Sequence, residues 1–477
     1  MNRIHRQRRR TLLLAGAAAA SVTATFALGP SASAATAAEF NKGHGVLTIV
    51  GDARGNAITV GRDAAGAIDV NGGAVDIHGA RATVANVHLI VVFGGGGNDR
   101  IALDESNGPL PNAHLHGGTG DDELFGGSGA DRLHGDAGND RLTGGRGSDQ
   151  SFGGPGNDQL IWNPGDGSDL NEGGDGSDAV VVNGGGAAEA FTATADGTRV
   201  RFDRVSPLPF SLDIGTSERL MVNANGGDDT FAASGDLAPL IALNVDGGPG
   251  NDQISGGNGN DTLSGGAGDD VVDGNAGADS AVLGEGNDTF VWDAGDGSDT
   301  VEGQAGQDSL VFNGAAVAEK LDLSANGSRA VLVRDVGHIK MDLNGIENVD
   351  TNVLGGADTV TVNDLSGTDV TQTDVALDGA PKTGDGAADT VVVNATNAAD
   401  TVTITGDQQN GVTVSGLHAV VNVFGTDGSA DALAFNALAG NDTVDATGLA
   451  PGAIGLTVNG GDGTDVLSGG PGTVLVQ

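Results

Sequence analysis

The stretch GGTGDDELF GGSGADRLH GDAGNDRLT GGRGSDQSF GGPGNDQLI, residues 117–161, decides the fold of this chain. It consists of five consecutive nine-residue units on the template G-G-x-G-x-D-x-U-x, where U is usually an apolar residue. Five units of the same length follow one another again over residues 247–291. Tandem units with one short period predict a solenoid, in which each unit buries its apolar side against its neighbours.

The first six positions of the unit, G-G-x-G-x-D, also recur outside the two tandem runs. Inside the runs, Asp136 and Asn275 replace a second glycine and Leu283 replaces a first one. The U position holds leucine, isoleucine or valine in most units, and Ser151 is an exception. The ten strict matches begin at Gly94, Gly117, Gly126, Gly144, Gly153, Gly173, Gly247, Gly256, Gly265 and Gly460.

A longer repeat is superimposed on the short one. The segment Trp162–Asp169 recurs 130 residues later as Trp292–Asp299, and Glu218 recurs 129 residues later as Glu347. A module of about 130 residues is therefore duplicated. Each copy is predicted to contain a nonapeptide array, a tryptophan segment and a spacer of alternating strands. Asn-Gly at 326–327, between two alternating runs, predicts a hairpin in the second spacer.

The composition is that of a thin and acidic β-protein. The 477 residues include 85 glycines, 64 Asp or Glu and 22 Lys or Arg, so the formal net charge is -42. Hydrophobic residues make up 38% and aromatic residues 3%, which suits many thin layers better than one thick core. The charge argues against nucleic acid and anionic membranes as partners, because both would be repelled. The absence of cysteine excludes disulfides and thiolate metal sites.

The tandem units resemble the nonapeptide repeats of the RTX (hemolysin-type) calcium-binding proteins. Residues 117–125 and 256–264 match that repeat at every defined position. The resemblance implies an all-β fold, a right-handed parallel β-roll or β-solenoid with two nonapeptides per turn and with several Ca²⁺ ions between stacked loops. It also implies that repeat n shares a metal with repeat n+2. The expected pairs are Asp122 with Asp140, Asp131 with Asp149, Asp140 with Asp158, Asp252 with Asp270, Asp261 with Asp279, and Asp270 with Asp288.

The residue types of the unit suit this role. Ca²⁺ takes 6–8 oxygen ligands. Glycine allows a positive φ that turns backbone carbonyls toward one point, and the sixth-position Asp supplies a carboxylate on a short stem. The alternative is that these aspartates only accept hydrogen bonds from turn amides. That alternative leaves the nine-residue phase and the accumulated charge unexplained. The predicted calcium ligands are Asp99, Asp122, Asp131, Asp140, Asp149, Asp158, Asp178, Asp252, Asp261, Asp270, Asp279, Asp288, Asp308 and Asp465.

Residues 1–34 are predicted to be a cleaved secretion signal. Arginines precede the apolar stretch Leu12–Leu28, and Ala32–Ala34 has the pattern of a cleavage site, so the mature chain is expected to begin near Ala35. Paired arginines leave the twin-arginine export route open beside the Sec route. No second apolar run is long enough for membrane insertion, so an extracellular protein is expected.

The predicted organisation has seven segments. They are a signal peptide (1–34), an N-terminal β-rich cap (35–93), a first array with its Trp segment (94–182), a β spacer (183–224), a second array with its Trp segment (225–311), a β spacer (312–350) and a degenerate β-repeat tail with one terminal repeat (351–477).

No catalytic constellation accompanies the repeats. The chain has no G-x-S-x-G, H-E-x-x-H or P-loop motif. His114 and His116 alternate along one predicted strand and are expected to face outward, while Trp162 and Trp292 are expected to pack over the ends of the two arrays. We therefore expect no enzymatic activity.

The predicted function is a secreted, multi-site calcium-binding protein that folds on Ca²⁺ binding. A structural or adhesive role outside the cell is expected, with cell-surface or matrix polymers as partners. The alternative is an extracellular polysaccharide-active β-helix enzyme that uses calcium structurally.

Overall fold

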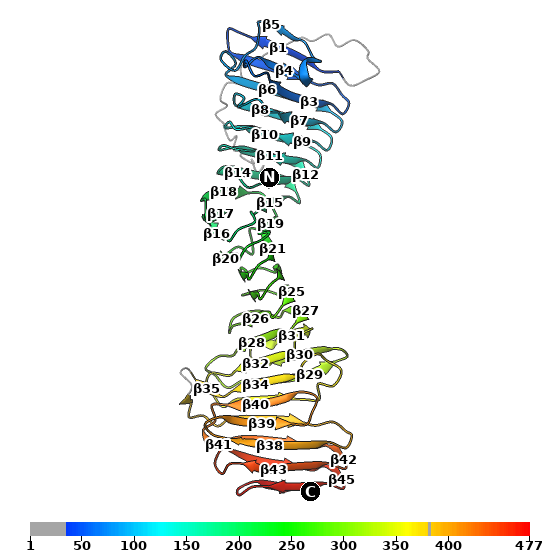
Figure 1. The fold of residues 1–477 in the computed structure, drawn as a ribbon, viewed down its shortest axis with the longest axis vertical. Helices are drawn as coiled ribbons and strands as arrows, with labels where there is room; N and C mark the ends of the chain where they lie inside the picture. The colour runs from blue at the N-terminus through cyan, green and yellow to red at the C-terminus, as the bar shows by residue number, and fades with distance from the viewer. Residues whose placement is uncertain (1–34, 380–382) are drawn as a thin grey trace, which may run out of the picture.

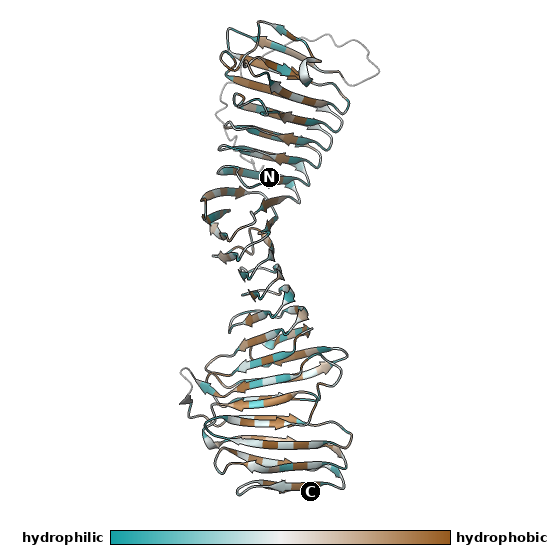
Figure 2. Cartoon of the chain, viewed as in Figure 1, coloured by the Kyte–Doolittle hydropathy of each residue, from teal (hydrophilic) through white to brown (hydrophobic). Residues whose placement is uncertain are grey.

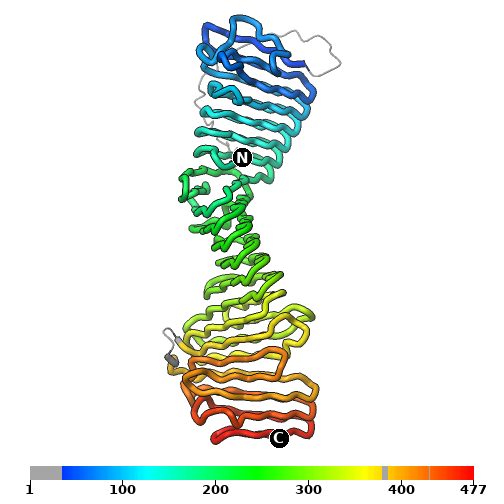
Figure 3. Tube along the Cα trace, in the orientation of Figure 1, coloured from blue at the N-terminus to red at the C-terminus, as the bar shows by residue number. Residues whose placement is uncertain are grey.

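The computed structural model describes residues 35–379 and 383–477, which form one long solenoid of β-strands (Figure 1). The predicted signal peptide, residues 1–34, lies outside the described residues. The chain runs from one end of the stack to the other without turning back (Figure 3). Within the described part, the helices are two 3-10 turns, η1 (Asn71–Gly73) and η2 (Val336–His338). Neither is long or apolar enough to cross a membrane.

Two long sheets carry the fold. Sheet A contains β1 (Ala37–Asn41), β2 (Val46–Val50), β5 (Ile77–Gly79), β6 (Leu89–Gly96), β8 (Ala113–Thr119), β10 (Arg132–Ala137), β12 (Gln150–Gly156), β14 (Asp169–Gly176), β16 (Ala190–Asp196), β17 (Arg199–Ser206), β18 (Phe210–Gly215), β20 (Thr230–Ser234), β22 (Gln253–Ser255), β24 (Val271–Asp273), β26 (Thr289–Trp292), β28 (Ser309–Asn313), β32 (Asn348–Asn352), β34 (Gln372–Ala376), β38 (Thr401–Asp407), β39 (Gly411–Ser415), β40 (Val420–Phe424), β43 (Thr443–Leu449) and β46 (Val466–Gly469).

The second long sheet faces the first across a narrow core. Sheet B contains β3 (Ala57–Arg62), β4 (Ile68–Val70), β7 (Arg100–Leu103), β9 (Glu123–Phe125), β11 (Arg141–Thr143), β13 (Gln159–Trp162), β15 (Ala179–Asn183), β19 (Arg219–Asn223), β21 (Ala242–Pro249), β23 (Thr262–Ala267), β25 (Ser280–Gly286), β27 (Thr300–Gly306), β29 (Lys320–Asn326), β30 (Arg329–Arg334), β31 (Ile339–Asn344), β33 (Thr359–Val362), β37 (Thr390–Asn394), β41 (Gly428–Asn436), β44 (Ile454–Asn459) and β47 (Val474–Val476). The small pairs are β35 (Asp378–Gly379) with β36 (Thr383–Gly384), and β42 (Ala439–Gly440) with β45 (Asp462–Gly463).

Successive coils pair in parallel, and the register within an array is 18 residues. Arg132 of β10 lies opposite Gln150 of β12 in sheet A, and Leu142 of β11 lies opposite Leu160 of β13 in sheet B. Two nonapeptides therefore complete one coil. The predicted all-β fold with a parallel β-roll is confirmed.

Most strands turn alternate residues into the narrow core, and brown bands alternate with pale or teal ones along many strands of Figure 2. A three-residue strand of an array buries one apolar side chain, such as Leu124 or Leu142. A strand of the C-terminal part buries two, as Val391 and Val393 do in β37. A fully buried aliphatic side chain contributes roughly 2 kcal/mol, so the arrays have the weaker apolar core.

Beyond the antiparallel pairs β1–β2 and β3–β4, three antiparallel meanders interrupt the regular coils in the described part of the chain. Strands β16, β17 and β18 form a meander inserted in sheet A between β14 and β20. Strands β29, β30 and β31 form one in sheet B between β27 and β33. The hairpin predicted at Asn326–Gly327 is the β29–β30 turn of the second meander. Strands β38, β39 and β40 form a third in sheet A between β34 and β43, which the sequence analysis had missed.

The two 130-residue copies use opposite sheets. In the first copy Trp162 ends β13 of sheet B, whereas its counterpart Trp292 ends β26 of sheet A. The meanders also lie in opposite sheets, the first in sheet A and the second in sheet B. An odd number of half-coils therefore separates the copies, and corresponding faces lie on opposite sides of the solenoid.

Each of the first two meanders is anchored on a buried cation. In the first, the Arg204 guanidinium lies 5.1 Å from the Trp162 ring centroid and 2.6 Å from Glu189 Oε1, and Trp162 stacks on Phe210. Trp162 is 2% exposed, as its predicted packing role requires. The second meander repeats the arrangement with Arg334, Glu319 and Trp292, which stacks on Phe312.

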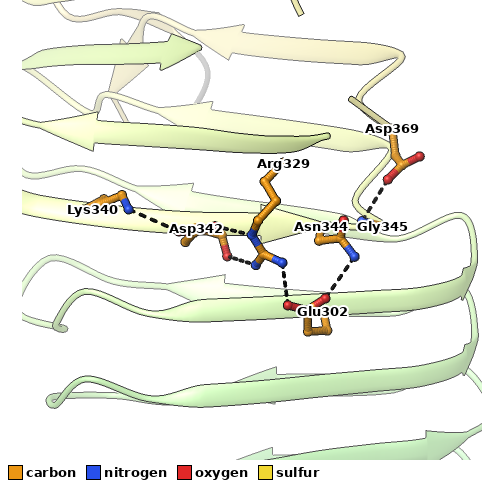
Figure 4. A network of polar contacts seen from close by, with 7 residues as sticks. All are labelled: Glu302, Arg329, Lys340, Asp342, Asn344, Gly345 and Asp369. Atoms are coloured by element: carbon orange, nitrogen blue, oxygen red, sulfur yellow. Dashed lines mark hydrogen bonds and ion pairs between the residues drawn. The ribbon is translucent and has the colours of Figure 1, made fainter. Parts of the chain in front are cut away.

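A polar network fastens the second meander to the coil below it (Figure 4). Arg329 pairs with Asp342 of β31 and, at 2.6 Å, with Glu302 of β27. Asn344 Nδ2 donates to Glu302 at 2.9 Å, and Lys340 Nζ lies 3.1 Å from Asp342. The first meander has the same connection through Arg199, Glu172 and Asp213.

The apolar core is divided inside the first array. One cluster ends at Leu142 and the next begins at Leu160. Between them, the inward positions of sheet A are polar, because Ser151 of β12 and Asn171 of β14 are buried there.

Candidate metal centre

The loops that join the strands of an array follow the six positions G-G-x-G-x-D. In the loop from Gly135 to Asp140, the second and fourth residues have positive φ, 71° at Asp136 and 145° at Gly138. Asn275 takes the same role in the second array, with φ 59°. Asp and Asn are the side chains that tolerate this conformation best, which explains why they replace the second glycine inside the tandem runs. Gln304, with φ 78°, takes the same position in the loop that ends at Asp308.

Loops of successive coils stack so closely that side chains are excluded. A Cβ on Gly117 would lie 2.7 Å from the carbonyl oxygen of Gly135 in the next coil, and it would also collide with Asp122 Oδ2. A Cβ on Gly247 would meet Gly265 O at 2.6 Å and Asp252 Oδ2. The space that the first glycine leaves is thus lined by a carboxylate oxygen and by a carbonyl oxygen of the next coil.

The sixth-position aspartates form a ladder along each loop column. The backbone N–H of Asp122 donates to Asp140 Oδ1 at 2.7 Å, and that of Asp140 donates to Asp158 Oδ1 at 2.8 Å. The structure brings together all six expected pairs in this way. The other four are Asp131 with Asp149, Asp252 with Asp270, Asp261 with Asp279, and Asp270 with Asp288.

The second oxygen of most ladder carboxylates has no partner. Each such Oδ2 is buried and receives no hydrogen bond from any described residue. A buried carboxylate oxygen without a donor is costly, so each of these atoms indicates a ligand. They belong to Asp99, Asp122, Asp140, Asp149, Asp158, Asp178, Asp229, Asp252, Asp270, Asp279, Asp288, Asp299, Asp308, Asp358 and Asp442.

Burial and neighbouring charge raise the pKa values of the ladder carboxyls in the two arrays. Burial raises the pKa of Asp140 to about 7 and that of Asp149 to about 8, and facing aspartates add to the effect. The second array repeats this, with the pKa of Asp270 at about 7 and that of Asp279 at about 8. Without a cation, the stack therefore retains protons close to neutral pH.

The donor set fits calcium rather than a transition metal. The available ligands are hard carboxylate and carbonyl oxygens, which Ca²⁺ prefers. Across the described residues, no three His, Cys, Asp or Glu side chains form a group that could hold a metal ion. Carboxylates alone would therefore not complete a site, and loop carbonyls would have to supply the other ligands. His114 and His116 alternate with buried Ala113 and Leu115, so they face outward.

Three of the fourteen predicted aspartates differ from the rest. Asp131 and Asp261 begin their columns, and their Oδ2 atoms accept hydrogen bonds from Gly127 N–H and Gly257 N–H, both at 2.7 Å. Asp465 is half-buried and accepts from the N–H of Asp442 at 3.0 Å. The other eleven all have the unpartnered Oδ2.

The ladder also contains aspartates that the glycine motif did not predict. The first glycine of the motif lies five positions before the Asp. At this position Ala224 precedes Asp229, Val353 precedes Asp358 and Ala437 precedes Asp442. The sequence signal common to these three and to Asp299 is an Asp followed, two positions on, by Val or Phe. The ladder crosses both spacers as well, because Asp178 N–H donates to Glu218, and Asp308 N–H to Glu347.

The fifth position of the unit forms a second ladder in the opposite direction. Asp121 Oδ1 accepts the N–H of Asn139 at 2.8 Å, and Asn139 Oδ1 accepts the N–H of Asn157 at 2.9 Å. Asp269 and Asn287 do the same in the second array. The many Asn and Asp residues at this position, which the template treats as variable, therefore satisfy loop amides.

Comparison with known families agrees with this geometry. The family model of the RTX calcium-binding nonapeptide repeat (4 copies) matches residues 91–107, 112–142, 125–160, 246–281, 255–290, 282–314 and 457–473. A search of the curated proteins found no match. The matched residues contain the stacked loops and most of the unpartnered carboxylates. The chain therefore carries RTX calcium-binding nonapeptide repeats in both of its arrays and at its C-terminal end.

Proposed function

We propose that this protein is secreted, binds several Ca²⁺ ions along its loop columns, folds on binding them and serves a structural or adhesive role outside the cell. The observation that supports this best is the series of buried Oδ2 atoms without a donor. Bound calcium would supply the missing positive charge at each of them.

The proposed ligands are the ladder aspartates of both arrays. Each ion would take Oδ2 of one aspartate and loop carbonyls from adjacent coils, while Oδ1 keeps its hydrogen bond to the neighbouring coil. We add Asp229 and Asp299 to the fourteen predicted residues. Asp131 and Asp261 would contribute least, because both of their carboxylate oxygens already accept hydrogen bonds.

Folding should depend on calcium in the arrays most of all. Each coil there buries few apolar side chains, while its aspartates repel one another at about one strand spacing. The free energy of calcium binding then becomes free energy of folding. We expect affinities of roughly 10⁻⁴ to 10⁻³ M, as in extracellular calcium modules of other folds.

The remaining parts of the proposal rest on the sequence. Residues 1–34 would direct export, by the Sec or the twin-arginine route, and the seven predicted segments would be the domain organisation. Calcium ions and cell-surface or matrix polymers would be the partners. No catalytic role is proposed.

A calcium titration of residues 35–477, followed by calorimetry and circular dichroism, tests the proposal. Several ions bound cooperatively with a gain of β-signal would support it. A complete β-signal in excess chelator, or no binding at millimolar calcium, would contradict it.

A further inference from the structure

A groove of about 620 Å³ opens on the outer face of sheet A in the C-terminal part of the solenoid. It lies over the ends of β28, β32, β34 and β40, beside the turn that joins β38 to β39. The residues that decide its chemistry are Asp350, Asn352, Asp374, Gln408, Gln409 and Phe424. This volume is in the range of sites for small organic ligands.

Three acidic residues line the groove, Asp350, Asp374 and Asp378, and the first two form its floor. Asp350 of β32 lies directly opposite Asp374 of β34, and Asp374 lies opposite Asn422 of β40. Asp374 Oδ1 accepts hydrogen bonds from Asn422 Nδ2 at 2.8 Å and Gln372 Nε2 at 3.1 Å, which fix its orientation. The Asp350 carboxylate has no hydrogen bond or ion pair within the described residues. Burial, followed by the charge of Asp374, raises the pKa of Asp350 to about 6.

Amides and one aromatic ring line the rest of the groove. Asn352 Nδ2 donates to Asn313 Oδ1 at 2.8 Å, so the Asn352 carbonyl oxygen stays available to a ligand. Gln408 Nε2 donates to the Thr426 carbonyl at 3.1 Å, which holds the turn of the β38–β39 hairpin in place. Phe424 is 37% exposed at the end of β40, so part of its ring is open to a ligand.

The lining contains neither Lys nor Arg, so it disfavours anionic ligands. The Asp374 carboxylate is held in place by two amides, and the groove amides can both donate and accept. Phe424 presents an aromatic ring beside the aliphatic side chains of Val311 and Leu354. An inorganic cation would use the carboxylates but neither the ring nor the length of the groove. We propose that this groove binds a neutral glycan chain, with Asp350 and Asp374 accepting hydrogen bonds from sugar hydroxyls and Phe424 packing against a sugar ring.

This site is separate from the calcium ladder. Asp350 and Asp374 stand on the outer face of strands, whereas the ladder aspartates stand in loops and face the stack. Most of the groove lining belongs to residues 350–425, outside the matched RTX repeats, and only Val311 and Asn313 fall at the end of the matched segment 282–314. Glycan binding and calcium binding can therefore succeed or fail independently.

The test is calorimetric titration of residues 35–477, in saturating calcium, with cellohexaose, maltohexaose and mannohexaose. A chitosan hexamer and hexagalacturonate serve as cationic and anionic probes. The variants are Asp374→Asn and Phe424→Ala. The matched control is Asp196→Asn, which removes one charge at an exposed hairpin turn outside the groove. A calcium titration of every variant checks folding.

We expect at least one neutral hexamer to bind, and each groove variant to weaken that binding about tenfold at unchanged calcium stoichiometry. Asp196→Asn should bind like the parent protein. Three results would overturn the proposal: no neutral hexamer binds, the groove variants bind neutral hexamers as tightly as the parent does, or only the chitosan hexamer binds. The last result would reassign the groove to cationic ligands.

Discussion

The two arrays have the same ladder but different cores. Asp140 and Asp270, 130 residues apart, make the same hydrogen bonds and have the same raised pKa of about 7. The inward positions of the first array, however, include Ser151 and Asn171, where the second array has Ala281 and Val301. The apolar core breaks at this point in the first array and is continuous through the second.

This difference shows that the loop ladder and the apolar core are separate sources of stability. The ladder tolerates polar residues in the core because its aspartates stand in loops, outside the strands. We therefore expect both arrays to bind calcium, and the first array to depend on it more.

The chain offers a direct way to observe each array. It has two tryptophans and no tyrosine, and the tryptophans lie at the ends of the two arrays. The variants Trp292→Phe and Trp162→Phe each leave one tryptophan, which reports on the first or the second array respectively.

Removing calcium should have the largest effect. Both arrays should lose their structure in excess chelator, because the ladder carboxylates then repel one another. The first array should unfold at a higher free calcium concentration than the second, as followed by the fluorescence of the two single-tryptophan proteins. Coincident transitions would contradict the comparison.

Acidification of the calcium-free protein should have the next largest effect, since many carboxyls act together. Their folded-state pKa values, about 6 to 8, lie above the unfolded value of 3.8. The folded form therefore binds protons more tightly, and this stabilisation is complete below about pH 4 and disappears as the pH rises through 6 to 8.

Circular dichroism of the calcium-free protein should accordingly show more β-structure at pH 5 than at pH 8. Calcium competes with these protons, so its affinity should fall between pH 8 and pH 6. A calcium affinity that does not change over this range would mean that the ladder carboxylates are not the ligands.

Val301→Asn would give the second array the polar residue that the first one has. It should lower the free energy of unfolding by about 3 kcal/mol, because it removes a buried aliphatic group and buries an amide. Chemical denaturation at saturating calcium, observed through Trp292, measures this. The surface change Val271→Asn, at a 40% exposed position, is the control.

Asp140→Asn should cost about 1.4 kcal/mol for each ion lost at a calcium concentration of 10 times Kd, through the loss of binding. Asp140 bonds with both Asp122 and Asp158, so calorimetry should find up to two fewer ions. Asp131→Asn is the matched control, since its Oδ2 already accepts a hydrogen bond, and should lose at most one ion. Equal losses in the two variants would refute the distinction between them.

Asn171→Val should have the smallest effect and the opposite sign. Filling this inward position with an aliphatic side chain should stabilise the first array by about 1 kcal/mol and bring its calcium midpoint closer to that of the second. The Trp162 fluorescence of the variant measures both. An unchanged midpoint would mean that the polar core is not the cause of the difference.

Much of the candidate site could be predicted from sequence. Asp122, Asp140 and Asp158 were expected to pair, and the structure links them by hydrogen bonds. Asp229 was missed as a ladder member because Ala224 replaces the first glycine and the loop no longer matches the motif. Asp229 still donates its N–H to Asp252 in the next coil. A ladder contact therefore depends on a carboxylate at the right position along the solenoid more than on the first glycine of the loop.

The third meander was missed for a related reason. Its strands, β38 to β40, lie in the degenerate tail, where no tryptophan segment precedes them. The tail is not part of the duplicated 130-residue module, so the duplication did not predict this meander. The Arg204–Glu189 pair was not predicted either. The two residues lie 15 positions apart, and only the meander brings them together beneath Trp162.

The sequence by itself determined the nine-residue period and the positions of the ladder aspartates that follow the glycine motif, while the resemblance to the RTX repeats implied two units to a coil. These are local properties, because a positive φ, a tight turn and one inward side chain per short strand are set by adjacent residues. Only the tertiary structure decided which sheet each meander joins, which distant carboxylates continue the ladder, and that the two copies face opposite sides. Those features depend on the number of half-coils between segments. Each inserted meander changes that number, but it does not change the nine-residue motif on either side of it.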